Sequence, residues 1–447
     1  MAVARRRSVT AYGVVAAPGG RGRYSHEKGD DMTRSRLLSY ENWLVFILGL
    51  TFGFVFFDRN AISFLMPFIV PDLGLSNTQV GLLNSGLSLT WAVSGYLIGR
   101  ASDATGKRRS YLVASVVVFS LCSFGSGLAG SFLALLLARM VMGIAEGPTL
   151  PISQSFMVIE SSPHRRGLNM GLMQNVFAAL LGSTVAPIVM VAVAQEHGWR
   201  SAFFFAGAPG LLIAFLIWKF VREPGRVPPA AASVQAAPAG PKLGTFALLR
   251  FRNMWLCSII CIAMVAWMVL GWTFLPLFYV GIRGLAPTEM GYLMSVLGVC
   301  AAVGGFVVPA ISDRLGRRPA LVFFCLLSML TPLAALYFEG SLFALAVLVF
   351  IGWSGAGCFP LFMATIPAET VPPRYMATAF GLVMGMGELI GGVLSPTLAG
   401  RAADLYGGSA PLYIMVGCAL VAGLLAVFLK ETAPLKVAAA ARLAVAT

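Results

Sequence analysis

A series of long apolar runs is the feature of this sequence that most restricts its fold. Each run is close to the roughly 20 residues that an α-helix needs to cross a bilayer. The runs cover residues 43–70, 77–99, 109–129, 131–158, 167–194, 200–221, 253–281, 287–311, 318–337, 341–366, 375–403 and 410–429. They predict an all-α membrane protein with twelve transmembrane helices.

The composition agrees with a chain that crosses the bilayer many times. The chain is 58% hydrophobic and 11% charged, whereas soluble domains carry about 25% charged residues. Its net charge of +14 could indicate nucleic-acid binding, but the bases gather in the loops after even-numbered runs. The opposite loops carry few bases, namely Arg200, Arg283 and Arg401. This asymmetry predicts cytoplasmic termini in a bacterial-type inner membrane, with the lipid bilayer and not nucleic acid as the partner.

The residues that usually carry metal, ATP or hydrolytic chemistry form no recognisable motif. All seven cysteines lie inside apolar runs, and the nearest pair, Cys257 and Cys261, has no histidine or second cysteine pair beside it. We interpret them as small core residues. A Walker P-loop and a catalytic triad are also missing from the sequence. We therefore expect no cofactor, no metal and no enzymatic activity.

The chain divides into tails, two apolar halves and a linker. Residues 1–40 are basic and aperiodic, which is typical of a disordered tail, and we expect translation to start at Met32, without residues 1–31. Residues 41–222 and 251–430 each hold six runs, which predicts two six-helix bundles. Residues 223–250 form a cytoplasmic linker that is rich in Pro and Ala, and residues 431–447 form a cytoplasmic tail.

An internal repeat relates the two halves at an offset of 210 residues (313 − 103). In the loops after the second and eighth runs, Asp103, Gly106, Lys107 and Arg108 align with Asp313, Gly316, Arg317 and Arg318. The glycines permit a positive φ in a tight turn, and each aspartate can pair with a base or face a helix N-terminus. Gly99 and Arg314 belong to the same two motifs, and the bases of these motifs could also serve only to set the membrane topology. Duplicated halves are typical of transporters that bind cargo between the repeats.

Two pairs of charged residues lie deep inside apolar runs. Asp58 and Arg59 are about 22 Å into the first helix, near the bilayer centre, where a charge costs about 2.5–3.5 kcal/mol. Arg139 and Glu146 are seven residues apart and share one face of the fourth helix. The positions 210 residues later are Met268, Val269, Val349 and Ala356. Because the repeated half lacks these charges, we expect them to serve function and not architecture.

The six-plus-six pattern and the doubled G-x-x-x-D-x-x-G-[RK]-[RK] motif resemble the major facilitator superfamily, although Ala104 and Pro309 depart from the motif. A finer resemblance is to its anion:cation symporter branch. It rests on Asp58-Arg59, Arg139-x-x-x-Gly143-x-x-Glu146, Trp272-x-x-x-Pro276-x-x-Tyr279 and Gln174. Trp91 aligns where sugar-acid members have Tyr, which favours a flatter, less hydroxylated cargo.

The resemblance implies two pseudo-symmetric six-helix bundles and a cytoplasmic gate at the residues of the two glycine motifs. We expect the chain to act as a monomer. The resemblance also implies a site for a small organic anion such as a sugar acid, an aromatic acid or a dicarboxylate. Arg59 would bind the cargo carboxylate, with Arg139 paired to an acid and with Gln174, Trp91 and Trp272 also contacting the cargo. Asp58 and Glu146 would carry the coupled protons, since an acid that loses its arginine to the cargo tends to take up a proton.

Glu388 is a third acid in the middle of a run, and its sequence context leaves two interpretations open. No base accompanies it in the C-terminal half, so it could pack as a neutral acid, or it could form a second proton or cargo site.

Two other functions also remain open. A proton-coupled exporter of drugs or metabolites is disfavoured because the fifth run, with Gly182 to Pro187, lacks the G-x-x-x-G-P-x-x-G-G signature of such drug exporters. A sensor that binds its ligand without transporting it is the other alternative, and a measurement of flux in proteoliposomes would separate it from a transporter.

Overall fold

The computed structural model describes residues 39–162, 164–223, 244–434 and 436. The described residues up to Trp43 and those from Leu44 onward belong to two separate units, and the contacts described below lie within the second. The expected start at Met32, most of the predicted linker and the end of the C-terminal tail lie outside the described residues.

The described part of the first half consists of helices joined by short turns. Its elements are α2 (Tyr40–Leu73), α3 (Asn77–Thr105), α4 (Arg108–Gly127), α5 (Phe132–Glu146), α6 (Thr149–Glu160), α7 (Arg166–Gly171), η1 (Leu172–Val176), η2 (Ala178–Val185) and α8 (Ala186–Phe220). The fourth predicted span is thus broken into α5 and α6 at Gly147-Pro148, because proline cannot continue a helix without losing a backbone hydrogen bond.

The second half is built in the same way. Its elements are η3 (Thr245–Arg250), α10 (Arg252–Leu277), η4 (Phe278–Ile282), α11 (Pro287–Leu315), α12 (Arg317–Leu327), α13 (Leu330–Tyr337), α14 (Leu342–Trp353), η5 (Ser354–Cys358), η6 (Leu361–Thr365), α15 (Ile366–Thr370), η7 (Pro373–Tyr375), α16 (Met376–Met386), η8 (Gly387–Leu394), α17 (Ser395–Tyr406) and α18 (Ala410–Ala426).

The predicted all-α membrane fold is confirmed, but its twelve spans are not all resolved as separate membrane-crossing helices. Within the described residues, nine helical segments are long and apolar enough to cross a bilayer. One of them, Arg166–Phe220, joins the fifth and sixth predicted spans, which bend apart at Gly198 with φ 82°. The helix α18 is apolar but shorter than the other candidates.

Capping residues and glycines set the ends of the helices, as the turn chemistry predicts. Ser76 and Gln79 form a capping box at the start of α3, which satisfies two backbone N–H groups that would otherwise lack partners. The predicted glycine turns are confirmed, because Gly106 has φ 70° and Gly316 has φ 112°. Both angles lie in the region that glycine adopts without steric cost. These turns join α3 to α4 and α11 to α12, so the motif connects consecutive helices in both halves.

Short π-helical segments interrupt several of the long helices. They are η1, η2, η4, η6 and η8. Such wide turns are rare and are frequently found at functional sites. Two of the predicted site residues lie on them, Gln174 on η1 and Glu388 on η8.

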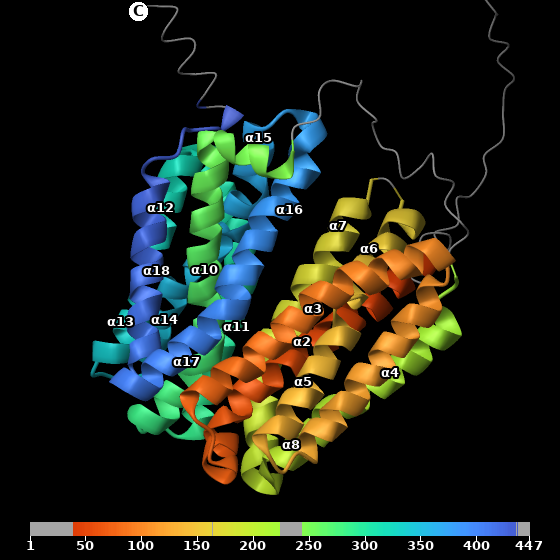
Figure 1. Ribbon diagram of the computed structural model, residues 1–447, viewed down its shortest axis with the longest axis vertical. Helices are drawn as coiled ribbons and strands as arrows, with labels where there is room; N and C mark the ends of the chain where they lie inside the picture. The colour runs from red at the N-terminus through yellow and green to blue at the C-terminus, as the bar shows by residue number, and fades with distance from the viewer. Residues whose placement is uncertain (1–38, 163, 224–243, 435, 437–447) are drawn as a thin grey trace, which may run out of the picture. The chain divides into compact units, whose positions relative to one another are not determined.

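The helices α2 and α10 are the most enclosed of the candidate spans. In the first half, α4 lies against α8 and α3 lies against α5; in the second, α18 lies beside α10 and α12 (Figure 1). The enclosed position of α2 explains why Asp58 is fully buried, although Arg59 beside it is only half-buried.

Contacts between the two halves occur where α3 and α11 begin and where α17 ends. Asp404 accepts hydrogen bonds from Asn77 and Thr78, and the Ser295 hydroxyl donates to the Thr184 carbonyl at 2.8 Å. Gly81 permits the close approach of α3 to α17, because a Cβ there would lie 2.2 Å from the Pro396 carbonyl oxygen. These contacts join the halves at the end opposite the repeated glycine turns.

Candidate functional site

Asp58 is fully enclosed by the first half. Its Oδ1 lies 2.6 Å from the Ser123 hydroxyl of α4, while its Oδ2 has no hydrogen-bond partner among the described residues. The same hydroxyl lies 2.9 Å from the Phe203 carbonyl oxygen of α8. The acid predicted from the sequence is therefore held where α2, α4 and α8 meet.

Arg59 points toward aromatic side chains instead of toward its neighbour Asp58. Its guanidinium carbon lies 5.2 Å from the centroid of Trp91 and 5.9 Å from that of Phe56. Both are cation–π distances. The side chain is only half-buried, and a stacked guanidinium keeps its N–H edge free for a carboxylate. The structure thus brings together Arg59 and Trp91, which the sequence assigned to one site.

The expected pairing of Arg139 with an acid is wrong in this structure. Arg139 is fully buried, and its Nη2 donates to the backbone carbonyl of Arg59 at 2.8 Å. Its Nη1 contacts the sulfur of Met142 at 3.1 Å. A carbonyl oxygen carries enough partial charge to accept this hydrogen bond, so the arginine braces the α2 backbone and forms no ion pair within 4.0 Å in the described part of the chain.

Glu146 ends α5 at the break in the fourth span. It is fully buried, and within the described ranges neither carboxyl oxygen has a hydrogen-bond partner. The charges of Arg59, Arg139 and Asp58 all act on it. The predicted quartet of Asp58, Arg59, Arg139 and Glu146 therefore lies on two helices, α2 and α5, which the hydrogen bond from Arg139 to the Arg59 carbonyl joins.

Glu388 lies on η8 and forms no ion pair within 4.0 Å in the described part of the chain. The charge that acts on it is that of Arg59, from the other half of the chain. The two residues are 329 positions apart (388 − 59), so the sequence of the C-terminal half alone does not display this charge. Both interpretations of Glu388, a neutral packed acid and a second proton or cargo site, therefore remain predictions.

Gln174 and Trp272 lie in different surroundings from each other. The Gln174 amide oxygen accepts a hydrogen bond from Gln154 of α6 at 3.1 Å. Gln154 was not among the site residues predicted from the sequence, although its amide lies inside the same apolar run as Glu146. Trp272 stacks edge-on against Trp353 at 5.5 Å and Phe64 at 6.2 Å. Trp272 therefore packs against side chains of both halves.

A pocket of about 500 Å³ connects Trp91 with the first glycine motif. It lies between α3 and α6, and its lining includes Trp91, Gly99, Asp103 and Gly147. The stacking partner of Arg59 and the predicted gate residues Gly99 and Asp103 thus line one cavity.

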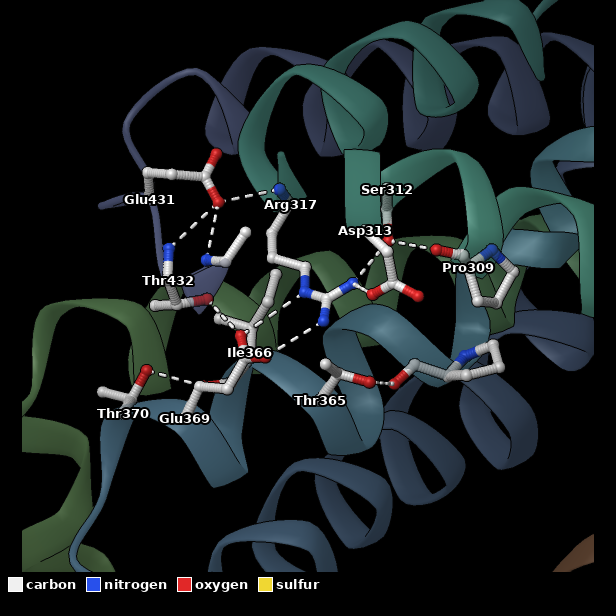
Figure 2. Close-up of polar contacts among 12 residues, drawn as sticks. Pro309, Ser312, Asp313, Arg317, Thr365, Ile366, Glu369, Thr370, Glu431 and Thr432 are labelled. Carbon is white, nitrogen blue, oxygen red and sulfur yellow. Dashed lines mark hydrogen bonds and ion pairs between the residues drawn. The ribbon is translucent and has the colours of Figure 1, made fainter. Parts of the chain in front are cut away.

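The second glycine motif forms a connected polar network, shown in Figure 2. Arg317 pairs with Asp313 of its own motif and with Glu369 at 3.1 Å. Glu431 accepts the backbone N–H groups of Arg317 and Arg318 at 2.8 and 3.1 Å, which caps the first turn of α12. The side chains of Arg314 and Arg318 are exposed.

In the first glycine motif, a base at a different position pairs with the motif aspartate. Asp103 pairs with Arg108 at 2.7 Å, whereas Lys107, which aligns with Arg317, is exposed. Glu223 accepts the backbone N–H of Arg109, as Glu431 does for α12. Both capping acids were missed, although each follows a Phe-x-base sequence at the end of its half. Both motif aspartates pair with bases of their own half.

Comparisons with known proteins agree with this architecture. The Major Facilitator Superfamily model matches residues 48–396. A probable 4-methylmuconolactone transporter of Cupriavidus pinatubonensis is 27% identical over 340 residues, which cover 75% of this chain and 78% of that protein. A probable galactarate/D-glucarate transporter of Escherichia coli is 25% identical over 413 residues, with 84% and 90% covered.

The solved structure of a D-xylose–proton symporter superposes with a TM-score of 0.70 at 18% identity, covering 88% of this chain and 99% of that one. That likeness concerns the fold. The similarity to transporters of organic acids confirms the resemblance to the anion:cation symporters. The chain belongs to the Major Facilitator Superfamily and is a multi-pass membrane transporter, not an enzyme.

Proposed function

We propose that the chain imports a small organic anion together with protons across the bacterial inner membrane, with both termini in the cytoplasm. The observation that carries this proposal is the setting of Arg59. It is a half-buried guanidinium on an enclosed helix, stacked on Trp91 and Phe56, beside two fully buried acids.

Arg59 supplies the anion receptor. A planar guanidinium binds a carboxylate through two parallel hydrogen bonds, and it stays charged at any physiological pH. The aromatic faces fix its orientation before the cargo arrives, which lowers the entropy lost on binding. The named organic-acid relatives support a carboxylate cargo, which includes ring-derived acids and sugar acids.

Asp58 and Glu146 supply the coupling to protons. With both acids protonated, the two arginines give the site a net charge of +2, which attracts an anion. With both acids ionised, the site is neutral and an anion loses this attraction. Proton binding and anion binding therefore favour each other, which is the thermodynamic requirement for symport.

Alternating access follows from the duplicated halves, which rock about a site near the midplane. With cytoplasmic termini, the contacts of Asp404 and Ser295 close the outer end, which supports an inward-facing arrangement. The pocket from Trp91 to Asp103 then extends toward the cytoplasm. The polar network around Arg317 serves as part of the cytoplasmic gate.

A thermal-shift screen of the purified full-length chain against ring-derived acids, sugar acids and dicarboxylates tests the proposal. At least one carboxylate should raise the melting temperature increasingly with its concentration. Arg59→Lys should abolish that rise, since an ammonium cannot make the bidentate contact, whereas the control Arg200→Lys should keep it. Binding that is unchanged in Arg59→Lys, or no binding of any carboxylate, would contradict the proposal.

A further inference from the structure

The contacts of Ser123 allow the hydrogens around Asp58 to be counted. A serine hydroxyl has one hydrogen to donate and lone pairs to accept with. Its oxygen lies 2.6 Å from Oδ1 of Asp58 and 2.9 Å from the carbonyl oxygen of Phe203. Both distances are within the range of O–H···O hydrogen bonds, and a carbonyl oxygen can only accept.

One arrangement makes both contacts hydrogen bonds. If Ser123 donates to the Phe203 carbonyl, the hydrogen between Ser123 and Asp58 has to come from the carboxyl group. If Asp58 is ionised, Ser123 can serve only one of two acceptors, and the other contact leaves two oxygens facing each other with no hydrogen between them.

The burial of Asp58 points the same way. Its side chain is fully enclosed, and Oδ2 has no hydrogen-bond partner within the part of the chain that the structure describes. An ionised carboxylate with a bare oxygen in such a site carries a large desolvation cost. The nearby charged and titratable groups include Arg139 and Glu146 of α5 and Cys122 of α4. The neighbouring Arg59 turns its guanidinium toward Trp91 and Phe56, and Arg139 donates its Nη2 hydrogen bond to the backbone carbonyl of Arg59.

We propose that Asp58 carries a proton in this conformation and that Ser123 is its positioning residue. The Asp58 O–H donates a hydrogen bond to the Ser123 oxygen, and the Ser123 hydroxyl donates its own to the Phe203 carbonyl. This series of hydrogen bonds crosses from α2 through α4 to α8. Gly207 of α8 permits the close approach of α8 to Ser123, because a Cβ at this position would lie 3.0 Å from the Ser123 Cβ. The proton is therefore held by the packing of three helices of one half, and it leaves when that packing changes.

This inference deepens the proposed role of Asp58 in proton coupling, but its test needs neither the cargo nor transport. The readout is the infrared C=O stretching band of protonated carboxyl groups, recorded on the full chain in lipid nanodiscs at neutral pH. Asp58→Asn should remove one such band. Ser123→Ala should move that band to higher frequency, because the acid loses its acceptor.

Ser120→Ala is the matched control. Ser120 is equally buried on α4, but its hydroxyl donates to Val116 of its own helix, so the Asp58 band should not move. Ser123→Cys, which nearly keeps the volume of the side chain and offers a weaker acceptor, should shift the band in the same direction as Ser123→Ala. A spectrum without an Asp58 band at neutral pH, or a band that ignores both Ser123 variants, would overturn the proposal. Failure of anion transport alone would leave it standing.

Discussion

Asp404 at the end of α17 holds Thr78 at the start of α3. Its Oδ2 accepts the backbone N–H of Thr78 at 2.9 Å and the Thr78 hydroxyl at 2.5 Å. Its Oδ1 accepts the backbone and side-chain N–H groups of Asn77 at 2.9 and 3.0 Å. An acid from one half of the transporter thus caps a helix of the other half, where the helix dipole favours a negative charge.

Asp404→Asn should weaken this contact and shift the protein toward the conformation that is open at this end. Hydrogen bonds to a charged group contribute about 1.5–3 kcal/mol, which corresponds to a shift of about tenfold or more in the equilibrium. Distances between spin labels on α3 and α17 measure the shift. Asp72→Asn is the control, because Asp72 bonds with Arg200 within the first half. Equal distance distributions in the Asp404 variant and the wild type would refute the assignment.

Trp91→Ala should weaken cargo binding through Arg59. The ring faces the guanidinium, and loss of about 0.5–2 kcal/mol of cation–π interaction raises the Kd by about 2- to 30-fold. Trp91→Phe should lose less, because a smaller ring face remains. Calorimetric titration with the best carboxylate of the thermal screen measures both effects. An unchanged Kd in Trp91→Ala would show that the stacking does not prepare Arg59.

Glu388→Gln should tighten the binding of an anionic cargo. The carboxyl group of Glu388 and the Arg59 cation act on each other, and in its ionised form Glu388 competes with the cargo for that cation. The Kd should fall, and it should depend less on pH than in the wild type. Glu160→Gln at the end of α6 controls for the loss of an acid elsewhere. Weaker binding in Glu388→Gln would indicate that Glu388 contacts the cargo as a ligand instead.

Glu431 should make the stability of the protein depend on acid pH. Burial raises its pKa, but hydrogen bonds from the backbone N–H groups of Ala433, Arg317, Arg318 and Thr432 outweigh it, and the pKa falls below the usual 4.5. A depressed pKa contributes stability above the unfolded value and loses it as the pH falls through the folded value.

The melting temperature of the wild type should therefore drop on acidification below about pH 4.3. Glu431→Gln should melt at a lower temperature at neutral pH and lose less on acidification. Glu339→Gln, an exposed acid before α14, should behave as the wild type. A parallel pH dependence in Glu431→Gln and the wild type would contradict the capping role.

Much of the site could be predicted because a single sequence shows which charged residues lie inside apolar runs. A charge inside an apolar run is expensive, so Asp58, Arg59, Arg139 and Glu146 stand out by their position in the chain alone. The internal repeat then separates function from architecture, and the glycine turns follow from the steric freedom of glycine. These inferences need only local sequence and helix geometry.

The partners of these residues could not be predicted. The contact of Asp404 with Thr78 joins positions over 300 residues apart, and helix periodicity does not choose between distant helices. Arg139 was expected to pair with an acid, but a backbone carbonyl, which no sequence pattern displays, takes its hydrogen bond. Ser123 was hidden for another reason, since a serine in an apolar helix usually bonds to its own backbone.

Uptake into proteoliposomes tests proton-coupled import through Asp58 most directly. With an inward proton gradient and the carboxylate found in the thermal screen, the wild type should accumulate cargo above the outside concentration. Asp58→Asn should abolish this accumulation while it retains exchange of labelled for unlabelled cargo, because the anion site remains but its proton is no longer exchanged. Accumulation by Asp58→Asn equal to that of the wild type would contradict coupling through this acid.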